Sequence, residues 1–242
     1  MEKKKMFILK KTIQNILPYY LAKKYFLCED NKGKKPITFF MLNNLNFVQL
    51  YAGDVPINDL NRKKIGLSLT QNDENHIKFD ITELHSLNDN SVDTYQVEDV
   101  FEHIEYDKLE FVVKDIYRIL KPNGLFRLSI PDYRCDILYN RSIKDNYGNI
   151  IFDPEGGGRY CKKTKKVIDG GHVWLPTIEK VKSLLMKAPF SKIDYLHYYD
   201  ENGKPHYNKI DYAKGYIART PDHDERVKYP YRPLSIVVDC YK

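Results

Sequence analysis

Residues 90–132 contain the pattern that most constrains what this chain can fold into. They read in order as a strand, a short acidic turn, an amphipathic helix, a tight turn and a second strand. The apolar residues of the helical part recur at helical spacing: Leu109, Val112, Val113, Ile116 and Leu120. Pro122 and Gly124 end the helix, because proline cannot continue its hydrogen bonds and glycine tolerates the turn that follows. This order predicts a βαβ unit within a parallel sheet.

Length and composition favour one folded domain with a sizeable core. The chain has 242 residues, of which 42% are hydrophobic and 30% are charged. No run approaches the roughly 20 apolar residues that cross a bilayer, and the N-terminus lacks the pattern of a secretory signal. The four cysteines are scattered without a CxxC pair, so we expect neither a zinc site nor a disulfide framework. These features predict a soluble, cytoplasmic protein.

Positive charge is concentrated at the N-terminus. Residues 1–36 hold ten lysines and three acidic residues, a balance of +7, within a chain whose net charge is +6. The rest of the chain therefore carries −1, and no nucleic-acid partner is expected. We expect residues 1–45 to form a basic helical extension or lid, and residues 46–242 to form the main domain. Apolar residues between the lysines leave open a peripheral contact with a membrane surface or another protein.

Four motifs in the central stretch resemble the class I S-adenosylmethionine-dependent methyltransferases, in particular the predicted members associated with surface-polysaccharide gene clusters. They are Asn90-Ser91-Val92-Asp93, Glu102-His103, Ile119-Leu120-Lys121-Pro122-Asn123-Gly124 and Ser129-Ile130-Pro131-Asp132. The resemblance covers residues 47–242 and implies a Rossmann-like, doubly wound α/β fold with a mostly parallel sheet of seven strands. It also implies S-adenosylmethionine as the cofactor. A generic doubly wound βαβ unit is the alternative.

The resemblance implies a cofactor site in the turn after the first strand. That strand is expected over residues 47–50, and Tyr51, Ala52 and Gly53 follow it. In the family this turn is rich in glycine, which lets the backbone approach the methionine part of the cofactor. Here Tyr51 stands where the first glycine is usual. Either its ring lies beside the cofactor while its backbone makes the turn, or the loop closes in a different way.

Further cofactor contacts are expected at the ends of the next three strands. The family has an acidic residue for the ribose hydroxyls after its second strand, here residues 65–69, and this chain has Ser68 instead. The resemblance puts Asp80 near the adenine amino group and Ile81 against the ring, although Asp80 can also cap the turn that follows. The fourth strand is expected over residues 93–97, and Glu98 follows it at the carboxyl edge of the sheet, where ligands bind in such folds.

Three residues are candidates for catalysis. Asp99 and His103 follow the fourth strand on an acidic rim, where they either act on the substrate or orient the loop. His172 follows two glycines and is the first candidate for a base; the alternative is that it satisfies a loop carbonyl. Residues 133–175 are expected to form an insertion that faces the substrate. No metal-binding cluster stands out in the sequence, although carboxylates such as Asp99 leave a divalent ion open.

The resulting hypothesis is a methyltransferase that acts on a sugar hydroxyl in glycan or capsule biosynthesis. Its substrate would be a small molecule or a growing glycan, and the tyrosine-rich stretch 198–226 has aromatic faces that suit sugars. One alternative is transfer to an amino or phosphoramidate group of a glycan precursor. The other is a non-catalytic module that kept the fold and lost the cofactor.

Overall fold

The computed structural model describes residues 35–56 and 63–242 of the chain. The chain divides into two compact units, Met1–Pro36 and Ile37–Lys242, and all the described helices and strands lie in the second. No helix among the described residues is both long enough and apolar enough to cross a membrane.

Most of the N-terminal extension expected over residues 1–45 lies outside the described residues, so it stays a prediction. Its described end contains one short helix, α3 (Phe39–Leu42), which buries Leu42. The hydroxyl of Thr38 accepts a hydrogen bond from the backbone N–H of Met41 and so caps the start of this helix.

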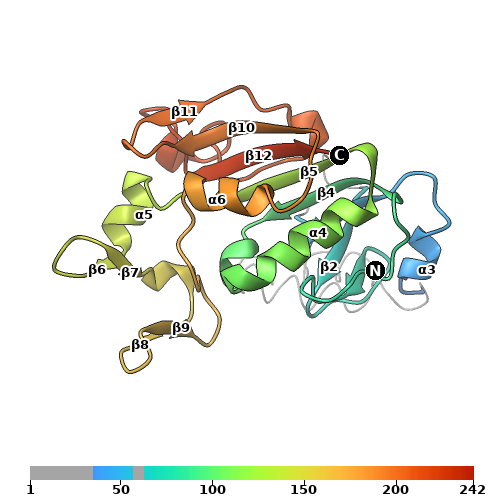
Figure 1. Ribbon diagram of the computed structural model, residues 1–242, viewed down its shortest axis with the longest axis horizontal. Coiled ribbons are helices and arrows are strands. Elements are labelled where there is room, and N and C mark those ends of the chain that lie inside the picture. Colours follow the sequence, from blue (N-terminus) through green and yellow to red (C-terminus); the bar gives the residue numbers. More distant parts are fainter. Residues whose placement is uncertain (1–34, 57–62) are drawn as a thin grey trace, which may run out of the picture. The chain divides into compact units, whose positions relative to one another are not determined.

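An eight-stranded sheet forms the centre of the second unit (Figure 1). Its strands are β1 (Gln49–Ala52), β2 (Ile65–Ser68), β3 (His76–Lys78), β4 (Val92–Glu98), β5 (Leu120–Pro131), β10 (Lys192–Tyr199), β11 (Pro205–Tyr207) and β12 (Ser235–Tyr241). Their order in space is β11-β10-β12-β5-β4-β1-β2-β3. β1 to β5 run parallel, whereas β12 is antiparallel to both neighbours and β11 is antiparallel to β10. The expected α/β fold with a mostly parallel sheet is confirmed, and β11 is added to the seven expected strands.

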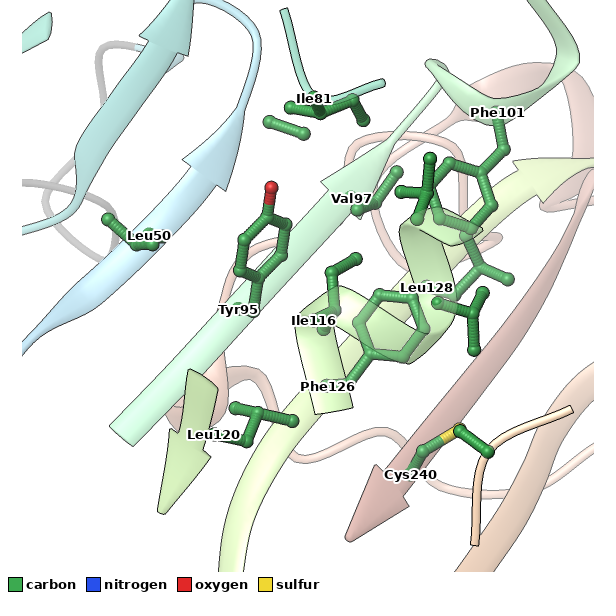
Figure 2. Close-up of a cluster of buried hydrophobic side chains, with 14 of the residues drawn as sticks. Leu50, Ile81, Tyr95, Val97, Phe101, Ile116, Leu120, Phe126, Leu128 and Cys240 are labelled. Atoms are coloured by element: carbon green, nitrogen blue, oxygen red, sulfur yellow. The ribbon is translucent and has the colours of Figure 1, made fainter. Parts of the chain in front are cut away.

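The βαβ unit predicted from residues 90–132 is present as β4, helix α4 (Leu109–Ile119) and β5. The apolar side chains that α4 buries are Leu109, Val112, Val113, Ile116 and Ile119. Each fully buried side chain of this size contributes about 1.5–3 kcal/mol to folding. Figure 2 shows Ile116 beside Val97 of β4 within the core. Helix α6 (Ile178–Leu185) packs on the same face, so α4 and α6 together cover one side of the sheet (Figure 1).

The opposite face of the sheet carries buried polar side chains beside a small apolar cluster of Val237 with Ile210 and Ile217. It is covered by residues 208–220, an irregular segment whose one helical turn is the 3₁₀ helix η4 (Tyr212–Lys214). The Arg127 guanidinium donates to two backbone carbonyls of this segment, at 2.8 and 2.9 Å, and the Gln96 amide donates to a third at 2.6 Å. These side chains satisfy backbone carbonyls that a helix would otherwise pair, and so they hold the segment in place although it is not helical.

The insertion expected over residues 133–175 consists of one helix and two small hairpins that lie away from the main sheet (Figure 1). Its elements are α5 (Asp136–Arg141), β6 (Ile143–Lys144), β7 (Ile150–Phe152), the 3₁₀ helix η3 (Pro154–Gly156), β8 (Arg159–Cys161) and β9 (Lys166–Ile168). The remaining 3₁₀ helices of the described residues are η1 (Phe101–His103), η2 (Tyr106–Lys108) and η5 (Glu225–Val227).

Strand β1 runs two residues beyond its predicted end. The prediction ended the strand at Leu50 and put Tyr51 and Ala52 in the turn, whereas both residues pair with β2 and with β4. That prediction is wrong, because both residues continue the central strand of a parallel sheet that is covered on both faces, where Tyr51 is 4% exposed and Ala52 is fully buried. Of the expected turn residues, Gly53 alone follows the strand.

Candidate active site

A cavity of about 380 Å³ lies at the carboxyl ends of β1 to β4. Its volume falls within the range of about 300–1,000 Å³ that small-molecule sites occupy. The residues that line it come from these strand ends and from the stretch before α4: Gly53, Leu67, Leu69, Phe79, Asp80, Ile81, Thr82, Asp99, Val100, His103, Ile104, Glu105 and Lys108. This is the edge at which open α/β sheets bind their ligands.

Gly53 forms the turn at one corner of the cavity. Its φ of 92° lies in the left-handed region that favours glycine, and its N–H donates to the carbonyl of Leu67 at 2.7 Å. With no side chain at this position, the backbone is open to close approach by a ligand.

Asp80 and Ile81 both line the cavity, as the resemblance implied for the adenine end of the cofactor. Asp80 Oδ1 accepts hydrogen bonds from the N–H and the hydroxyl of Thr82, at 2.9 and 2.8 Å. Asp80 therefore caps its turn and also presents a carboxylate, the acceptor that an exocyclic amino group needs. Ile81 is 5% exposed and joins the apolar core (Figure 2).

Ser68 does not line the cavity. Its hydroxyl accepts hydrogen bonds from the backbone N–H groups of Thr70 and Gln71, at 3.1 and 2.9 Å, and the residue is 1% exposed. The next residue, Leu69, is 67% exposed and lines the cavity in its place. Ser68 thus shapes the turn after β2, and the apolar side chain of Leu69 lines the cavity.

Tyr51, Ala52 and Glu98 also lie away from the cavity lining. The Tyr51 hydroxyl donates to Glu98 Oε2 at 3.4 Å, and the backbone N–H of Ala218 donates to Glu98 Oε1 at 2.7 Å. Burial, followed by the nearby charge of Asp99, raises the pKa of Glu98 to about 7. Tyr51 and Glu98 thus belong to the polar face that residues 208–220 cover.

Asp99 has the features of a strained functional residue. Its φ of 53° is left-handed, which is uncommon outside glycine and concentrates at functional sites. Arg219 lies 2.9 Å from Asp99 Oδ2, while Oδ1 has no hydrogen-bond partner among the described residues. Burial raises the pKa of Asp99, although the charge of Arg219 opposes this. Asp99 lines the cavity, and its unpartnered Oδ1 atom is itself buried.

His103 and His172 pack edge to face, with ring centroids 4.9 Å apart. His103 lines the cavity, whereas His172 is 7% exposed and lies outside the lining. Burial, together with the nearby His103, lowers the pKa of His172 to about 4, so its imidazole is neutral near neutral pH. The structure therefore brings Asp99 and His103 to the cavity and puts His172 behind His103.

Two hydrogen bonds hold the loop before α6 against the loop after β4. The backbone N–H of Val173 donates to the carbonyl of Glu102 at 2.8 Å, and the Trp174 indole donates to the carbonyl of Phe101 at 2.8 Å. The two imidazoles therefore keep their relative position through backbone contacts as well as through their rings.

Glycines allow the insertion to pack on His172. A Cβ added to Gly156 would lie 2.8 Å from the His172 ring, and one added to Gly171 would collide with the backbone of Gly157. The sequence alone suggests only flexibility for three consecutive glycines, Gly156 to Gly158. The sequence contained one sign of this contact, the pair of glycines directly before His172. It could not show that the two loops meet, because they are separated along the chain.

Comparison with known families indicates the kind of enzyme to which this cavity belongs. A family model described as a methyltransferase domain matches residues 42–128, which contain β1 to β4, α4 and most of β5. The match and the fold support a methyltransferase enzyme with S-adenosylmethionine as its cofactor. The bare turn at Gly53 and the Asp80 carboxylate fit that cofactor, because both lie on the wall of a cavity of suitable size.

Solved structures of similar shape include a SAM-dependent methyltransferase from Archaeoglobus fulgidus, with 18% identity and a TM-score of 0.47 over 90% of this chain and 99% of that one. A second, from Mesorhizobium loti, has 13% identity and a TM-score of 0.44 over 81% and 91% of the two chains. A search among curated proteins found no match.

Proposed function

We propose that the protein transfers a methyl group from S-adenosylmethionine to a hydroxyl of a sugar, in a small precursor or in a growing glycan. The observation that carries this proposal is the cavity at the carboxyl edge of the sheet, which joins the cofactor-side residues Gly53 and Asp80 to Asp99 and His103. A carboxylate and an imidazole on the wall of the same cavity suit an acceptor that must lose a proton.

When bound, S-adenosylmethionine supplies a methyl group whose bond to sulfur breaks as the acceptor oxygen forms the new C–O bond, with the electron pair staying on sulfur. The hydroxyl proton goes to a base, and we assign that role to Asp99, whose carboxylate lines the cavity. His103 orients the acceptor from the same wall, and His172 holds His103 from behind. Alignment of the acceptor with the methyl group contributes on the order of 7–11 kcal/mol in reactions of this kind.

Exposed aromatic side chains in the C-terminal part of the chain, outside the cavity lining, suit contacts with a growing glycan. Tyr207 and Tyr231 are 50% and 40% exposed, and their rings lie 5.2 Å apart in an edge arrangement. Such rings stack on the C–H faces of sugars while nearby polar groups bond the hydroxyls. An amino or phosphoramidate acceptor on the same class of glycan is the second candidate, since Asp99 can also receive a proton from nitrogen.

The first test is calorimetric titration with S-adenosylmethionine and S-adenosylhomocysteine, followed by methyl transfer to a panel of sugars and amino sugars. We expect one cofactor per chain with a dissociation constant in the micromolar range. Asp99→Asn should lower turnover by about 10²- to 10⁴-fold while changing cofactor affinity much less. Equal losses of turnover and affinity would remove Asp99 from the role of base, and no binding to folded protein would favour a non-catalytic module.

We further propose that the protein works in the cytoplasm, and that its lysine-rich N-terminal arm makes a peripheral contact with an anionic membrane surface or with another protein. The support is the balance of +7 over residues 1–36. Sedimentation with vesicles that contain anionic lipid, compared with vesicles of neutral lipid, would test the membrane contact; equal sedimentation with both would contradict it.

A further inference from the structure

We propose that Glu102, His103 and His172 form a binding site for a divalent transition-metal ion next to the cavity. Each offers one ligand atom, and these atoms all lie within 4.8 Å of one another. Metal–ligand bonds of about 2.0–2.2 Å put neighbouring ligands about 3.4 Å apart, so the side chains need to close by about an ångström. Two imidazoles with one carboxylate suit ions such as Zn²⁺, Mn²⁺, Fe²⁺ and Co²⁺.

The Glu102 carboxylate is an independent indication of a cation. Glu102 is fully buried, and among the described residues neither of its oxygens has a hydrogen-bond partner. His172 Nε2 lies 3.7 Å from Glu102 Oε1. A buried carboxylate without a partner is costly, and a cation between it and the two imidazoles would satisfy it.

Tyr133 determines which nitrogen of His172 is available to an ion. Its hydroxyl donates to Asp153 Oδ2 at 2.6 Å and lies 2.5 Å from His172 Nδ1. Because the single hydroxyl proton points to the carboxylate, the hydroxyl oxygen accepts the Nδ1–H of His172. The lone pair of His172 is then on Nε2, the nitrogen that faces Glu102. Metal-binding histidines usually donate their second N–H in this way.

Arg141 completes the support of this histidine. Its guanidinium donates to Asp153 Oδ2 through two nitrogens, at 2.5 and 3.1 Å, and so keeps the carboxylate as an acceptor for the Tyr133 proton. Arg219, the nearby cation on the other side, is paired with Asp99 at 2.9 Å. The contacts from Arg141 through Asp153 and Tyr133 thus orient His172 as a ligand. The positive charge of Arg219, which would repel an ion, is compensated by Asp99.

The place of His103 indicates what the ion would do. His103 belongs to both the cluster and the cavity wall, so an ion there lies within reach of an acceptor in the cavity. A divalent ion would lower the pKa of an acceptor hydroxyl, whose proton then passes to Asp99. This role rests on the proposed function, whereas the binding site itself does not.

Metal binding can be measured without cofactor or acceptor. The full-length protein, freed of metal with a chelator and shown to be folded by circular dichroism, is titrated with Co²⁺ and followed by visible absorption. We expect one ion per chain with a spectrum typical of nitrogen and oxygen ligands, and displacement of Co²⁺ by Zn²⁺.

Variants locate the ion. Glu102→Gln, which keeps the shape of the side chain, and His172→Ala should each weaken Co²⁺ binding by about 100-fold or more, whereas Tyr133→Phe should weaken it by about 10- to 100-fold. His206→Ala is the matched control, because its imidazole also lies beside a carboxylate, at 2.9 Å from Asp200, but outside the cluster. It should bind Co²⁺ as the natural protein does.

Loss of binding in Glu102→Gln and His172→Ala, with retention in His206→Ala, would support the site. Unchanged affinity in folded Glu102→Gln, or no binding of Co²⁺, Zn²⁺ or Mn²⁺ to the folded natural protein, would overturn it. Cofactor titration is a separate measurement. Intact S-adenosylmethionine binding without metal binding would therefore refute this site and leave the proposed function standing.

Discussion

Arg127 and Asp239 form a fully buried ion pair in the middle of the sheet. Two hydrogen bonds join them, Nε to Oδ1 and Nη2 to Oδ2, both at 2.7 Å, and the two residues face each other in the β5–β12 register. Their side chains are 1% and 4% exposed. The remaining Arg127 nitrogen holds residues 208–220 through two carbonyls, so this pair joins the sheet to the segment that covers its polar face.

Asp239→Asn is therefore expected to destabilise the protein by about 3–5 kcal/mol, because it leaves the Arg127 charge buried without compensation. Urea unfolding followed by circular dichroism would measure the change. Asp194→Asn removes a carboxylate from an exposed pair with Lys192 on β10 and should cost less than about 1 kcal/mol. Similar small losses in both variants would show that the buried pair contributes little.

Glu98 should make stability depend on pH. Because its pKa is raised from 4.5 to about 7 in the folded state, its favourable contribution is complete below pH 4.5 and is lost as the pH rises through about 7. Between about pH 5 and about pH 8.5, Glu98→Gln should gain on the order of 1–3 kcal/mol relative to the natural protein. Urea unfolding at both pH values measures this gain.

Glu225→Gln provides the control for that experiment, since it changes an exposed carboxylate that pairs with Lys228. Its stability should follow that of the natural protein at both pH values. If Glu98→Gln did the same, the buried carboxylate would not titrate as described.

Asp80→Ala should weaken the binding of S-adenosylmethionine by about 10- to 100-fold, the loss expected for one hydrogen bond to a charged group. Calorimetric titration gives the dissociation constant. The matched control is Asp145→Ala, because Asp145 also caps a turn through backbone N–H groups but lies in the β6–β7 hairpin, outside the cavity lining. Unchanged affinity in Asp80→Ala would remove this residue from the site.

Ser68→Ala should lower stability and leave cofactor affinity unchanged. The substitution removes two hydrogen bonds to backbone N–H groups, at 2.9 and 3.1 Å, which together are worth about 1–2 kcal/mol. Thermal unfolding and calorimetric titration on the same variant separate the two effects. A tenfold loss of affinity with unchanged stability would instead support the ribose contact that the family resemblance implies.

Local patterns in the sequence were enough to predict most of the sheet. The strand predicted over residues 65–69 is β2 (Ile65–Ser68), and the predicted βαβ unit is present, since both depend on the periodicity of neighbouring residues. The polar face was not predictable. Arg127 stands among apolar residues of β5, and its partner Asp239 lies 112 positions further along the chain. No local pattern carries that information.

The sequence predicted which strand ends form the candidate site, but it predicted less well which side chains line the cavity. Adjacent residues of a strand point to opposite faces, so an error of one position exchanges a cavity residue for one on the other side. This is why Leu69 lines the cavity and Ser68 does not. Gly53, Asp80 and Asp99 follow strand ends and His103 ends η1, and all four line the cavity.

The position of β12 has a consequence for how the protein is made. β12 follows all other strands in the chain, yet it lies in the sheet between β5 and β10. A ribosome releases the β10–β11 hairpin first, and that hairpin reaches the sheet only through β12. Until β12 is available, the edge of β10 that pairs with it has no partner strand. That edge is then open to chaperones or to other nascent chains. Completion of the sheet depends on the emergence of residues 235–241 from the ribosomal tunnel.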